Sequence, residues 1–283
     1  MSDERALFPL PFALALAPTG ARRNKTDHPA LPMTPDEIVR ETALSVEAGA
    51  TMLHLHVRDR EGRHTLDADA YRAAISAIRR ELGERVLIQI STEALGRYMP
   101  HEQMALVRTL LPEAVSLAIG ELVPDESAEQ TASDFYHWLS HRGIGVQHIL
   151  YSGTEVERFS ALVQRGVVAY ERPHALFVLG RYTTGQQSEP GGVLRFLASW
   201  PSEWPWSLCA FGSTEARCMT LAAALGAHAR IGFENNLQLP DGTPATSNAD
   251  LVKNMVKLSA CIGRPVADIS QARCIYGIER SAS

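Results

Sequence analysis

Short apolar runs alternate with amphipathic segments along nearly the whole 283-residue chain. Each apolar run has the length of a strand, and a segment with helical periodicity follows it after a short connection. Uninterrupted apolar strands that alternate with helices are typical of a parallel sheet. The expected strands are Phe12–Ala17, Thr51–Asp59, Arg85–Ser91, Ala114–Ile119, Gly145–Leu150, Ala175–Leu179, Trp206–Phe211 and Ala227–Phe233.

The helices are marked by their own start and stop signals. In the first, Thr34 is a candidate N-cap, Pro35 occupies the first helical position and Glu37 completes a capping box. This helix runs to about Glu47 and stops at Gly49. The other expected helices are Asp67–Leu82, His101–Leu111, Ala128–Arg142, Thr154–Arg165, Gly191–Trp200, a segment from Ser213-Thr214 to Gly226, and Ser247–Ile262.

Eight strand–helix units predict an α/β fold, a closed (β/α)8 TIM barrel that forms a single domain over residues 1–283. An open doubly wound sheet is the alternative, but no GxGxxG motif follows the first strand.

The second expected strand has polar side chains that can bind a metal or a ligand on one of its faces. Side chains alternate across a strand, so Met52, His54, His56 and Arg58 share one face and Leu53, Leu55 and Val57 the other. Two imidazoles one strand repeat apart, about 7 Å at the Cα atoms, can converge on one metal ion. The competing interpretation is a pair of hydrogen-bonded core histidines, and the metal interpretation requires a third ligand.

The last expected strand offers that ligand. Active sites of such barrels lie at the carboxyl ends of the strands, and strand eight borders strand one, which borders strand two. Glu234 can therefore reach an ion held by His54 and His56, and a His2Glu set leaves coordination positions open. Other polar residues expected at this mouth are Thr19, Arg22, Arg58, Asp59, Ser91, Thr92, Glu93, His228 and Arg230.

Several of these residues also have purely structural interpretations. Arg230 and Glu234 can form an inward salt bridge that closes the barrel mouth. Asn235 and Asn236 can satisfy backbone groups at the strand end. Ser213-Thr214 can cap the seventh helix or bind a phosphate at its N-terminus. The cluster Trp200, Trp204 and Trp206 is more typical of a core or a subunit interface than of a ligand site.

Composition narrows the class of protein. The net charge is −5 and the pI is near 6.1, and no basic run occurs, which argues against nucleic acid as the main partner. The four cysteines have no CxxC spacing, so we expect reduced thiols and a cytoplasmic protein. Phe8–Ala17 resembles the apolar part of a signal peptide, but Met1–Arg5 lacks the required positive charge. No apolar run reaches the roughly 18 residues of a membrane span.

Several stretches together resemble the β-keto acid cleavage enzyme family. The match covers nearly the whole chain in order, and its most specific parts are HLHVRD at 54–59 and the R-x-G-x-E strand at 230–234. The other matching stretches are Ala17-Pro18-Thr19-Gly20-Ala21, Pro32-Met33-Thr34-Pro35-Asp36-Glu37-Ile38, Ala48-Gly49-Ala50, Phe177-Val178-Leu179-Gly180, Asn235-Asn236 and Ser247-Asn248-Ala249.

The resemblance implies a zinc-dependent (β/α)8 barrel, usually a homo-tetramer, that converts a β-keto acid and acetyl-CoA into acetoacetate and a new acyl-CoA. It implies that His54, His56 and Glu234 hold zinc, that Arg230 neutralises negative charge beside the metal, and that Ser91 contacts the substrate. The expected substrate-binding residues are Thr19, Arg22, Arg58, Thr92 and Ser213.

One position departs from the family pattern. The family commonly has Glu-Asp-Asn after strand eight, where this chain has Glu234-Asn235-Asn236. The Asp is thought to help activate the substrate, whereas the neutral amide of Asn235, at the equivalent catalytic position, cannot accept a proton as a base. Two alternatives to the family reaction therefore stay open: a metal-dependent aldolase or lyase that acts without CoA, and a catalytically silent paralogue that binds a metabolite.

Overall fold

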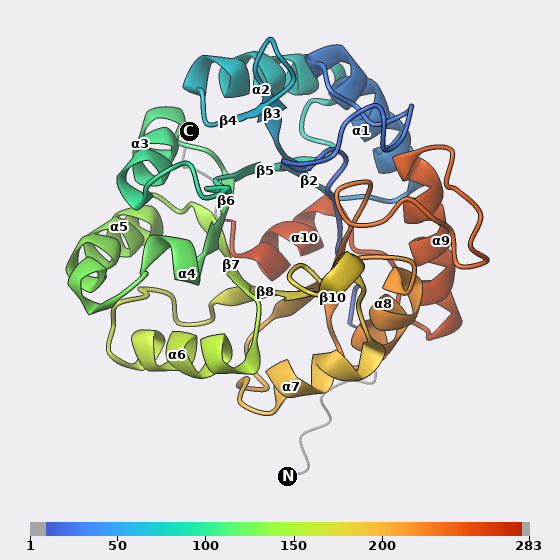
Figure 1. The fold of residues 1–283 in the computed structure, drawn as a ribbon. Helices are drawn as coiled ribbons and strands as arrows, with labels where there is room; N and C mark the ends of the chain where they lie inside the picture. Colours follow the sequence, from blue (N-terminus) through green and yellow to red (C-terminus); the bar gives the residue numbers. More distant parts are fainter. Residues whose placement is uncertain (1–9, 279–283) are drawn as a thin grey trace.

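Strand β1 (Leu14–Leu16) pairs in parallel with β2 (Met52–Leu55) on one side and with β10 (His228–Ile231), the last strand of the chain, on the other. This pairing closes the sheet of the computed structural model, which describes residues 10–278, and confirms the predicted (β/α)8 barrel (Figure 1). The charge pattern of residues 1–5 lies outside the described residues. The other barrel strands are β5 (Leu87–Ser91), β6 (Ala114–Ala118), β7 (Gly145–Leu150), β8 (His174–Leu179) and β9 (Trp206–Ala210).

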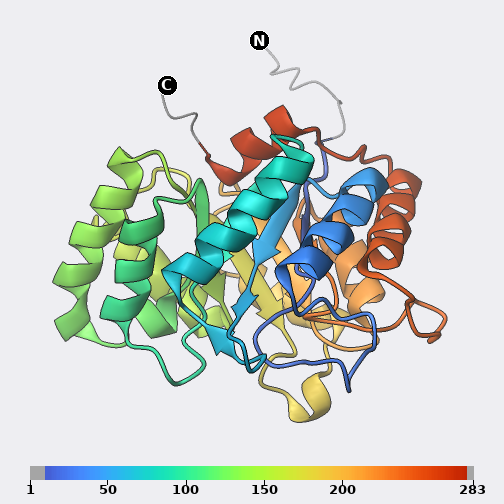
Figure 2. The same cartoon turned by 90° about the horizontal axis from the view of Figure 1, so that it is seen from above.

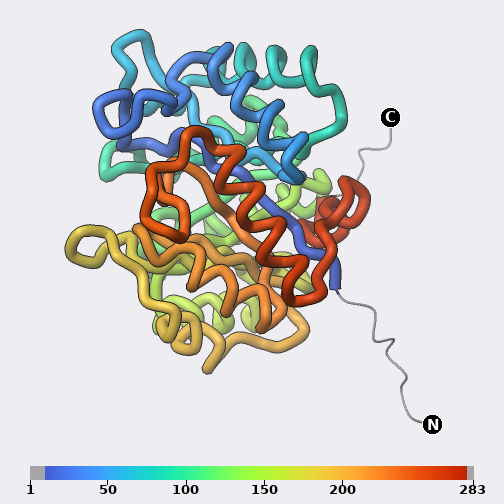
Figure 3. The backbone as a smooth tube through the Cα atoms, turned by 90° about the vertical axis from the view of Figure 1, so that its right-hand side faces the viewer, coloured from blue at the N-terminus to red at the C-terminus, as the bar shows by residue number. Residues whose placement is uncertain are grey.

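Helices surround the barrel because the outward faces of the strands are apolar. Leu53 and Leu55 of β2, for example, belong to the main core together with Ile38 of α1 and Tyr71 of α2. Figure 3 shows α9 packed between α1 and α8. The outer helices are α1 (Pro35–Ala48), α2 (Ala68–Leu82), α3 (Pro100–Leu110), α5 (Glu129–His141), α6 (Gly153–Gln164), α7 (Val193–Leu197), α8 (Glu215–Ala224) and α9 (Asn248–Cys261).

The predicted helix signals are partly confirmed. Thr34 caps α1 and forms a capping box with Glu37, as expected. Thr214 occupies the N-cap position of α8, but its hydroxyl donates to the carbonyl of Ser188 at 2.5 Å and makes no capping hydrogen bond, so the predicted Ser213-Thr214 cap is wrong. The Thr214 hydroxyl instead ties the loop after β8 to the start of α8.

The long histidine strand predicted at 51–59 is in fact two elements. Strand β2 ends at Leu55, and β3 (Val57–Arg58) leaves the barrel to pair antiparallel with β4 (His64–Thr65). A turn around Gly62 returns the chain, so a hairpin projects from the mouth of the barrel. Residues after 55 therefore belong to a mouth loop rather than to the barrel wall.

The other end of the barrel is closed by α10 (Ile269–Tyr276), a helix that the sequence pattern did not predict. The small interior side chains of Ala13, Ala15 and Ala114 leave room for Tyr276, which is buried against them. Figure 2 shows α10 at one end of the barrel and the β3–β4 hairpin at the other. One short helix, α4 (Ile119–Leu122), and three 3-10 turns, Glu126–Ala128, Thr184–Gln186 and Pro190–Gly192, complete the fold.

Two groups of residues lie away from the mouth. Trp200 and Trp206 are buried in an aromatic cluster with Phe177, which confirms their core interpretation. His228 is the first residue of β10 and accepts a hydrogen bond from the Ala13 amide at 3.1 Å, at the end of the barrel that α10 covers. Its predicted position at the mouth is wrong, because alternation fixes the face of a strand but not the end at which a residue lies.

None of the helices in residues 10–278 is long and apolar enough to cross a bilayer.

Candidate metal centre

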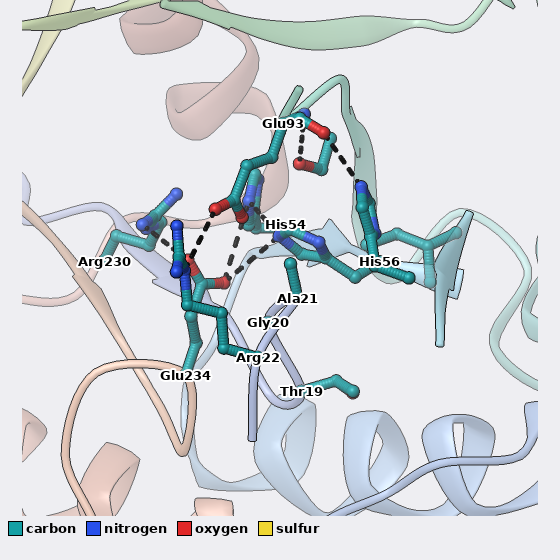
Figure 4. Close-up of polar contacts among 12 residues, drawn as sticks. Thr19, Gly20, Ala21, Arg22, His54, His56, Glu93, Arg230 and Glu234 are labelled. Atoms are coloured by element: carbon teal, nitrogen blue, oxygen red, sulfur yellow. Dashed lines mark hydrogen bonds and ion pairs between the residues drawn. The ribbon is translucent and has the colours of Figure 1, made fainter. Parts of the chain in front are cut away.

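Three predicted ligands converge at the carboxyl ends of the barrel strands (Figure 4). The Nε2 atoms of His54 and His56 are 3.1 Å apart, and Oε2 of Glu234 lies 3.8 Å from the first and 3.3 Å from the second. A zinc ion with bonds of about 2.0–2.1 Å in tetrahedral geometry separates its ligand atoms by about 3.3 Å. The spacing of these three atoms therefore fits a single ion.

Neighbouring residues hold the ligands ready for a cation. The Nδ1 atom of His54 lies 2.8 Å from Oε1 of Gln89, whose amide nitrogen donates to Gln147 at 3.3 Å. The amide orientation makes Gln89 an acceptor, so His54 carries its proton on Nδ1 and directs the Nε2 lone pair at the centre. Burial, and then Arg230, hold the pKa of His54 well below its usual value, so the imidazole is neutral.

The two carboxylate oxygens of Glu234 have different surroundings. Oε1 accepts a hydrogen bond from Arg230 at 3.0 Å, while the buried Oε2 has no hydrogen-bond partner and faces the histidines. Burial alone would raise the pKa of Glu234, but Arg230 and the histidines outweigh it and the pKa lies well below its usual value. The expected salt bridge and the expected ligand are therefore compatible, since each uses a different oxygen of one carboxylate.

Arg230 is held rigidly beside this carboxylate. Its side chain is buried, and Nη2 also donates to the Sγ atom of Cys209 at 3.4 Å. The Nε atom is buried with no partner. A guanidinium with an unused donor in this position can hold an anionic substrate group next to a metal.

The ligands line a narrow cavity of about 30 Å³ at the mouth of the barrel. Ser91, Thr92 and Arg230, all predicted site residues, share its lining. The Ser91 hydroxyl accepts from the Glu93 amide at 3.2 Å, which leaves its proton free for a substrate oxygen. Arg181, after β8, bridges to Glu93, after β5, at 2.6 Å, and both side chains line the cavity. This ion pair therefore joins the loops after β8 and β5 at the cavity.

Three predicted substrate-binding residues use their polar groups on the protein backbone. Thr19 donates to the Pro32 carbonyl at 2.9 Å, and Thr92 donates to the Ser116 carbonyl at 3.0 Å. The guanidinium of Arg58 donates to the carbonyls of residues 20, 21, 23 and 62 at 2.5–3.2 Å. These side chains therefore fix the loops around the metal centre.

The other two predicted substrate-binding residues, Arg22 and Ser213, differ in their position relative to the metal cavity. Arg22 is exposed at the mouth, where its Nε atom lies 3.9 Å from the carboxylate of Glu93. Ser213 is exposed on the loop before α8 with its Oγ 3.5 Å from Gln187, and it does not line the metal cavity. Arg22 is available to a ligand at the mouth, whereas Ser213 is separate from the cavity.

Sequence reasoning missed several residues that line the cavity or support it. Gln89 alternates with Ser91 on β5, so the strand periodicity contained a signal for it. Burial raises the pKa values of Glu121 and Tyr151. Glu121 reaches the cavity from the short helix α4 and Tyr151 from the loop after β7, and the sequence specifies the position of neither. Arg181 follows the predicted strand Ala175–Leu179 by two residues, but its pairing with Glu93 depends on the closed barrel.

Asn235 is buried and does not line the metal cavity. Both polar atoms of its buried side chain lack a hydrogen-bond partner, while its backbone carbonyl accepts hydrogen bonds from the Gly212 amide and from Arg23.

The next residue, Asn236, donates to the buried carboxyl of Glu215 at 3.0 Å. Burial raises the pKa of Glu215 to about 8, so this group is largely protonated at neutral pH.

Replacing Glu215 with glutamine is expected to stabilise the protein by about 2–4 kcal/mol at pH 8 and by little near pH 4.5. The folded pKa lies above the unfolded value of 4.5, so the wild type loses stability as the pH rises from 4.5 to about 8. Glutamine resembles the protonated acid and removes this loss. Urea unfolding at both pH values measures the free energy of unfolding of the wild type and of Glu215→Gln, with the exposed Glu81→Gln as the control. An equal change in this free energy at pH 4.5 and pH 8 would contradict the prediction.

Gly20 sets the distance between the loop after β1 and Glu234. It has φ +66°, and a Cβ atom there would lie 2.5 Å from Cγ of Glu234. We expect Gly20→Ala to displace the carboxylate and to weaken metal binding about 10–100-fold. Gly166→Ala is the matched control, because it has φ +74° and no atom within 4 Å of the added Cβ. Metal titration of both variants measures their metal affinities. Equal affinities of Gly20→Ala and Gly166→Ala would rule out this spacing role for Gly20.

Comparisons with known proteins show which family the chain belongs to. The model of the beta-keto acid cleavage enzyme family matches residues 11–278. The 3-keto-5-aminohexanoate cleavage enzyme of Acetoanaerobium sticklandii is 30% identical over 266 residues, 92% of this chain and 96% of the relative. The enzyme of the same name from Fusobacterium nucleatum is 32% identical over 274 residues, 92% and 96% of the two chains.

A more distant relative and a solved structure extend the comparison. The 3-oxoadipate:acetyl-CoA acetyltransferase of Cupriavidus necator is 29% identical over 280 residues, 95% of each chain. The complex of ObcA with oxaloacetate superposes with a TM-score of 0.70 at 18% identity, covering 89% of this chain and 68% of ObcA, which supports the barrel fold alone. With a family match from residue 11 to residue 278, the chain belongs to the beta-keto acid cleavage enzyme family and is an enzyme that breaks a carbon–carbon bond.

Proposed function

We propose that this enzyme is zinc-dependent and transfers the acyl group of a β-keto acid to CoA, with acetyl-CoA as co-substrate. In this reaction R–CO–CH2–COO⁻ and acetyl-CoA give R–CO–SCoA and acetoacetate. The bond between the keto carbon and the CH2 group breaks, the CH2 group forms a new bond to the acetyl carbon, and the CoA sulfur passes from acetyl to R–CO. The acetyl-CoA transferase name of the Cupriavidus necator relative supports the choice of co-substrate.

The convergence of His54, His56 and Glu234 in one cavity carries this proposal. When bound there, zinc would polarise a keto oxygen and stabilise the negative charge that develops on it. Manganese, iron or cobalt can use the same nitrogen and oxygen ligands, so metal analysis has to establish the identity.

The surrounding residues have separate roles in the proposal. Arg230 would neutralise the substrate carboxylate with its unused Nε donor. Ser91 would donate its hydroxyl proton to a substrate oxygen. Thr19, Thr92 and Arg58 would position the loops that carry these groups, while Arg22 at the mouth would meet an anionic part of a ligand.

Asn235 keeps a second candidate open. The amide cannot act as the base that the family Asp provides, and its side chain does not line the metal cavity. The second candidate is a metal-dependent aldolase or lyase that acts without CoA, or a silent protein that binds a metabolite in the same cavity.

One experiment separates these functions. Metal content of the purified protein is measured, and a panel of β-keto acids is then assayed with and without acetyl-CoA for acetoacetate. About one zinc per chain and acetoacetate only with acetyl-CoA are expected. Cleavage that is indifferent to acetyl-CoA would favour the lyase, and zinc without turnover would favour the silent protein. Activity that appears only in Asn235→Asp would also support the silent protein.

We also propose that the enzyme is a cytoplasmic homo-tetramer. Its four cysteines are free, as in proteins of a reducing compartment. Light scattering of the purified protein tests the oligomer, and four chains per particle are expected.

A further inference from the structure

A groove of about 650 Å³ lies beside the mouth of the metal cavity. The loop after β1, the β3–β4 hairpin and the loop after β5 form its walls. Its lining includes the residues Met33 and Leu95, which are apolar, and four arginines, Arg22, Arg58, Arg63 and Arg97. We call this feature the arginine groove. Its volume is within the range of small-molecule sites.

The arginine groove concentrates positive charge on a chain whose net charge is −5. Glu61 is the one acidic residue in its lining, and it pairs with Arg63 at 3.1 Å. Arg63 also pairs with Asp59 at 2.9 Å. Glu93, which also pairs with Arg181, lies 3.9 Å from Arg22. These three carboxylates cancel only part of the positive charge of the four groove arginines, and an anion is favoured there.

The individual arginines differ in how firmly they are held. Arg58 is fixed by four backbone carbonyls, so its charge is in place without a ligand. Arg97 is exposed and packs over the Tyr98 ring with its Cζ 5.1 Å from the centroid. Among the described residues no carboxylate lies within 4 Å of the Arg97 guanidinium, so its donors are open to an anion.

The groove and the metal cavity are connected through Arg22. This side chain lines the arginine groove and also a small intermediate cavity that Glu93, Arg181 and Glu234 line. Glu93, Arg181 and Glu234 in turn line the metal cavity. Figure 4 shows Arg22 beside Glu93 and Glu234. A long ligand can therefore extend from the metal centre past Arg22 into the groove.

We propose that the arginine groove binds the phosphates of acetyl-CoA. This inference rests on the proposed function, which requires a thioester to enter the metal cavity. CoA carries its phosphates on an adenosine at the far end of the pantetheine arm, so its reactive and anionic ends need two connected sites. Arg97 binds the 3′-phosphoadenosine diphosphate beside the fixed charge of Arg58, Met33 and Leu95 contact the adenine, and the arm passes Arg22.

Arg97→Gln tests the site, because the exposed side chain contributes little to folding. We expect the KM for acetyl-CoA to rise about tenfold, as for loss of one charge-assisted hydrogen bond. The KM for acetyl-pantetheine, which lacks the phosphates, is expected to match the wild type. Arg80→Gln, an exposed arginine on α2 outside the groove, is the control and leaves both KM values unchanged.

Direct binding keeps this test separate from the proposed reaction. Calorimetric titration with CoA is expected to show about tenfold weaker binding to Arg97→Gln than to wild type. A wild type that binds CoA in this way but makes no acetoacetate would refute the proposed function and support the groove. Equal CoA affinity and equal KM in wild type and Arg97→Gln would overturn the groove assignment, whether or not the reaction occurs.

Discussion

Replacing His54 with alanine is expected to remove most of the bound metal and to lower kcat/KM about a thousandfold or more, since Lewis-acid polarisation is worth several kcal/mol. His54 supplies one of three ligand atoms, and its Nε2 lies 3.1 Å from that of His56 and 3.8 Å from the Glu234 carboxylate. Two remaining ligands cannot form the three-residue set of a catalytic zinc site. Metal analysis and steady-state kinetics on the same preparation measure both effects.

The control for this substitution is the exposed His137→Ala on α5, which is expected to keep its metal and activity. Chelation supplies a second readout. A metal that binds only the folded state stabilises it, so EDTA should lower the Tm of the wild type and leave the Tm of His54→Ala nearly unchanged. Full metal content in His54→Ala would show that the ion lies elsewhere.

Replacing Arg230 with methionine is expected to lower kcat about 100–1,000-fold while metal can still bind, as for loss of one preorganised donor. It should also destabilise the metal-free protein by about 3–5 kcal/mol, because a buried carboxylate loses its partner. Arg230 is 3% exposed and donates to Glu234 at 3.0 Å. Kinetics with saturating zinc and urea unfolding in EDTA separate the two effects.

Two further variants identify the cause of the Arg230 effect. Arg230→Lys keeps the charge but loses the planar donor set, so it should recover stability more than activity. Arg230→Met combined with Glu234→Gln removes both charges and should recover stability in EDTA but not activity. If Arg230→Met alone were as stable as the wild type in EDTA, the Glu234 carboxylate would not depend on this partner.

The candidate metal centre could be predicted because its signals are local or follow from barrel closure. His54 and His56 project to the same side through strand alternation, even though the strand ends between them. Glu234 follows the last strand, and closure of the barrel brings that strand next to β1. Periodicity, strand order and chain direction therefore determine this group of ligands without any knowledge of the loops.

Eight strand–helix units, the closed barrel and three candidate metal ligands could be predicted from the residues alone, because apolar periodicity is a property of neighbouring residues. Three features became apparent only in the folded chain: Arg58 holds loops, Arg181 bridges to Glu93, and α10 closes the far end. Such contacts join residues far apart in the chain. Their geometry depends on where each loop leaves the barrel, and no local pattern of residues encodes that position.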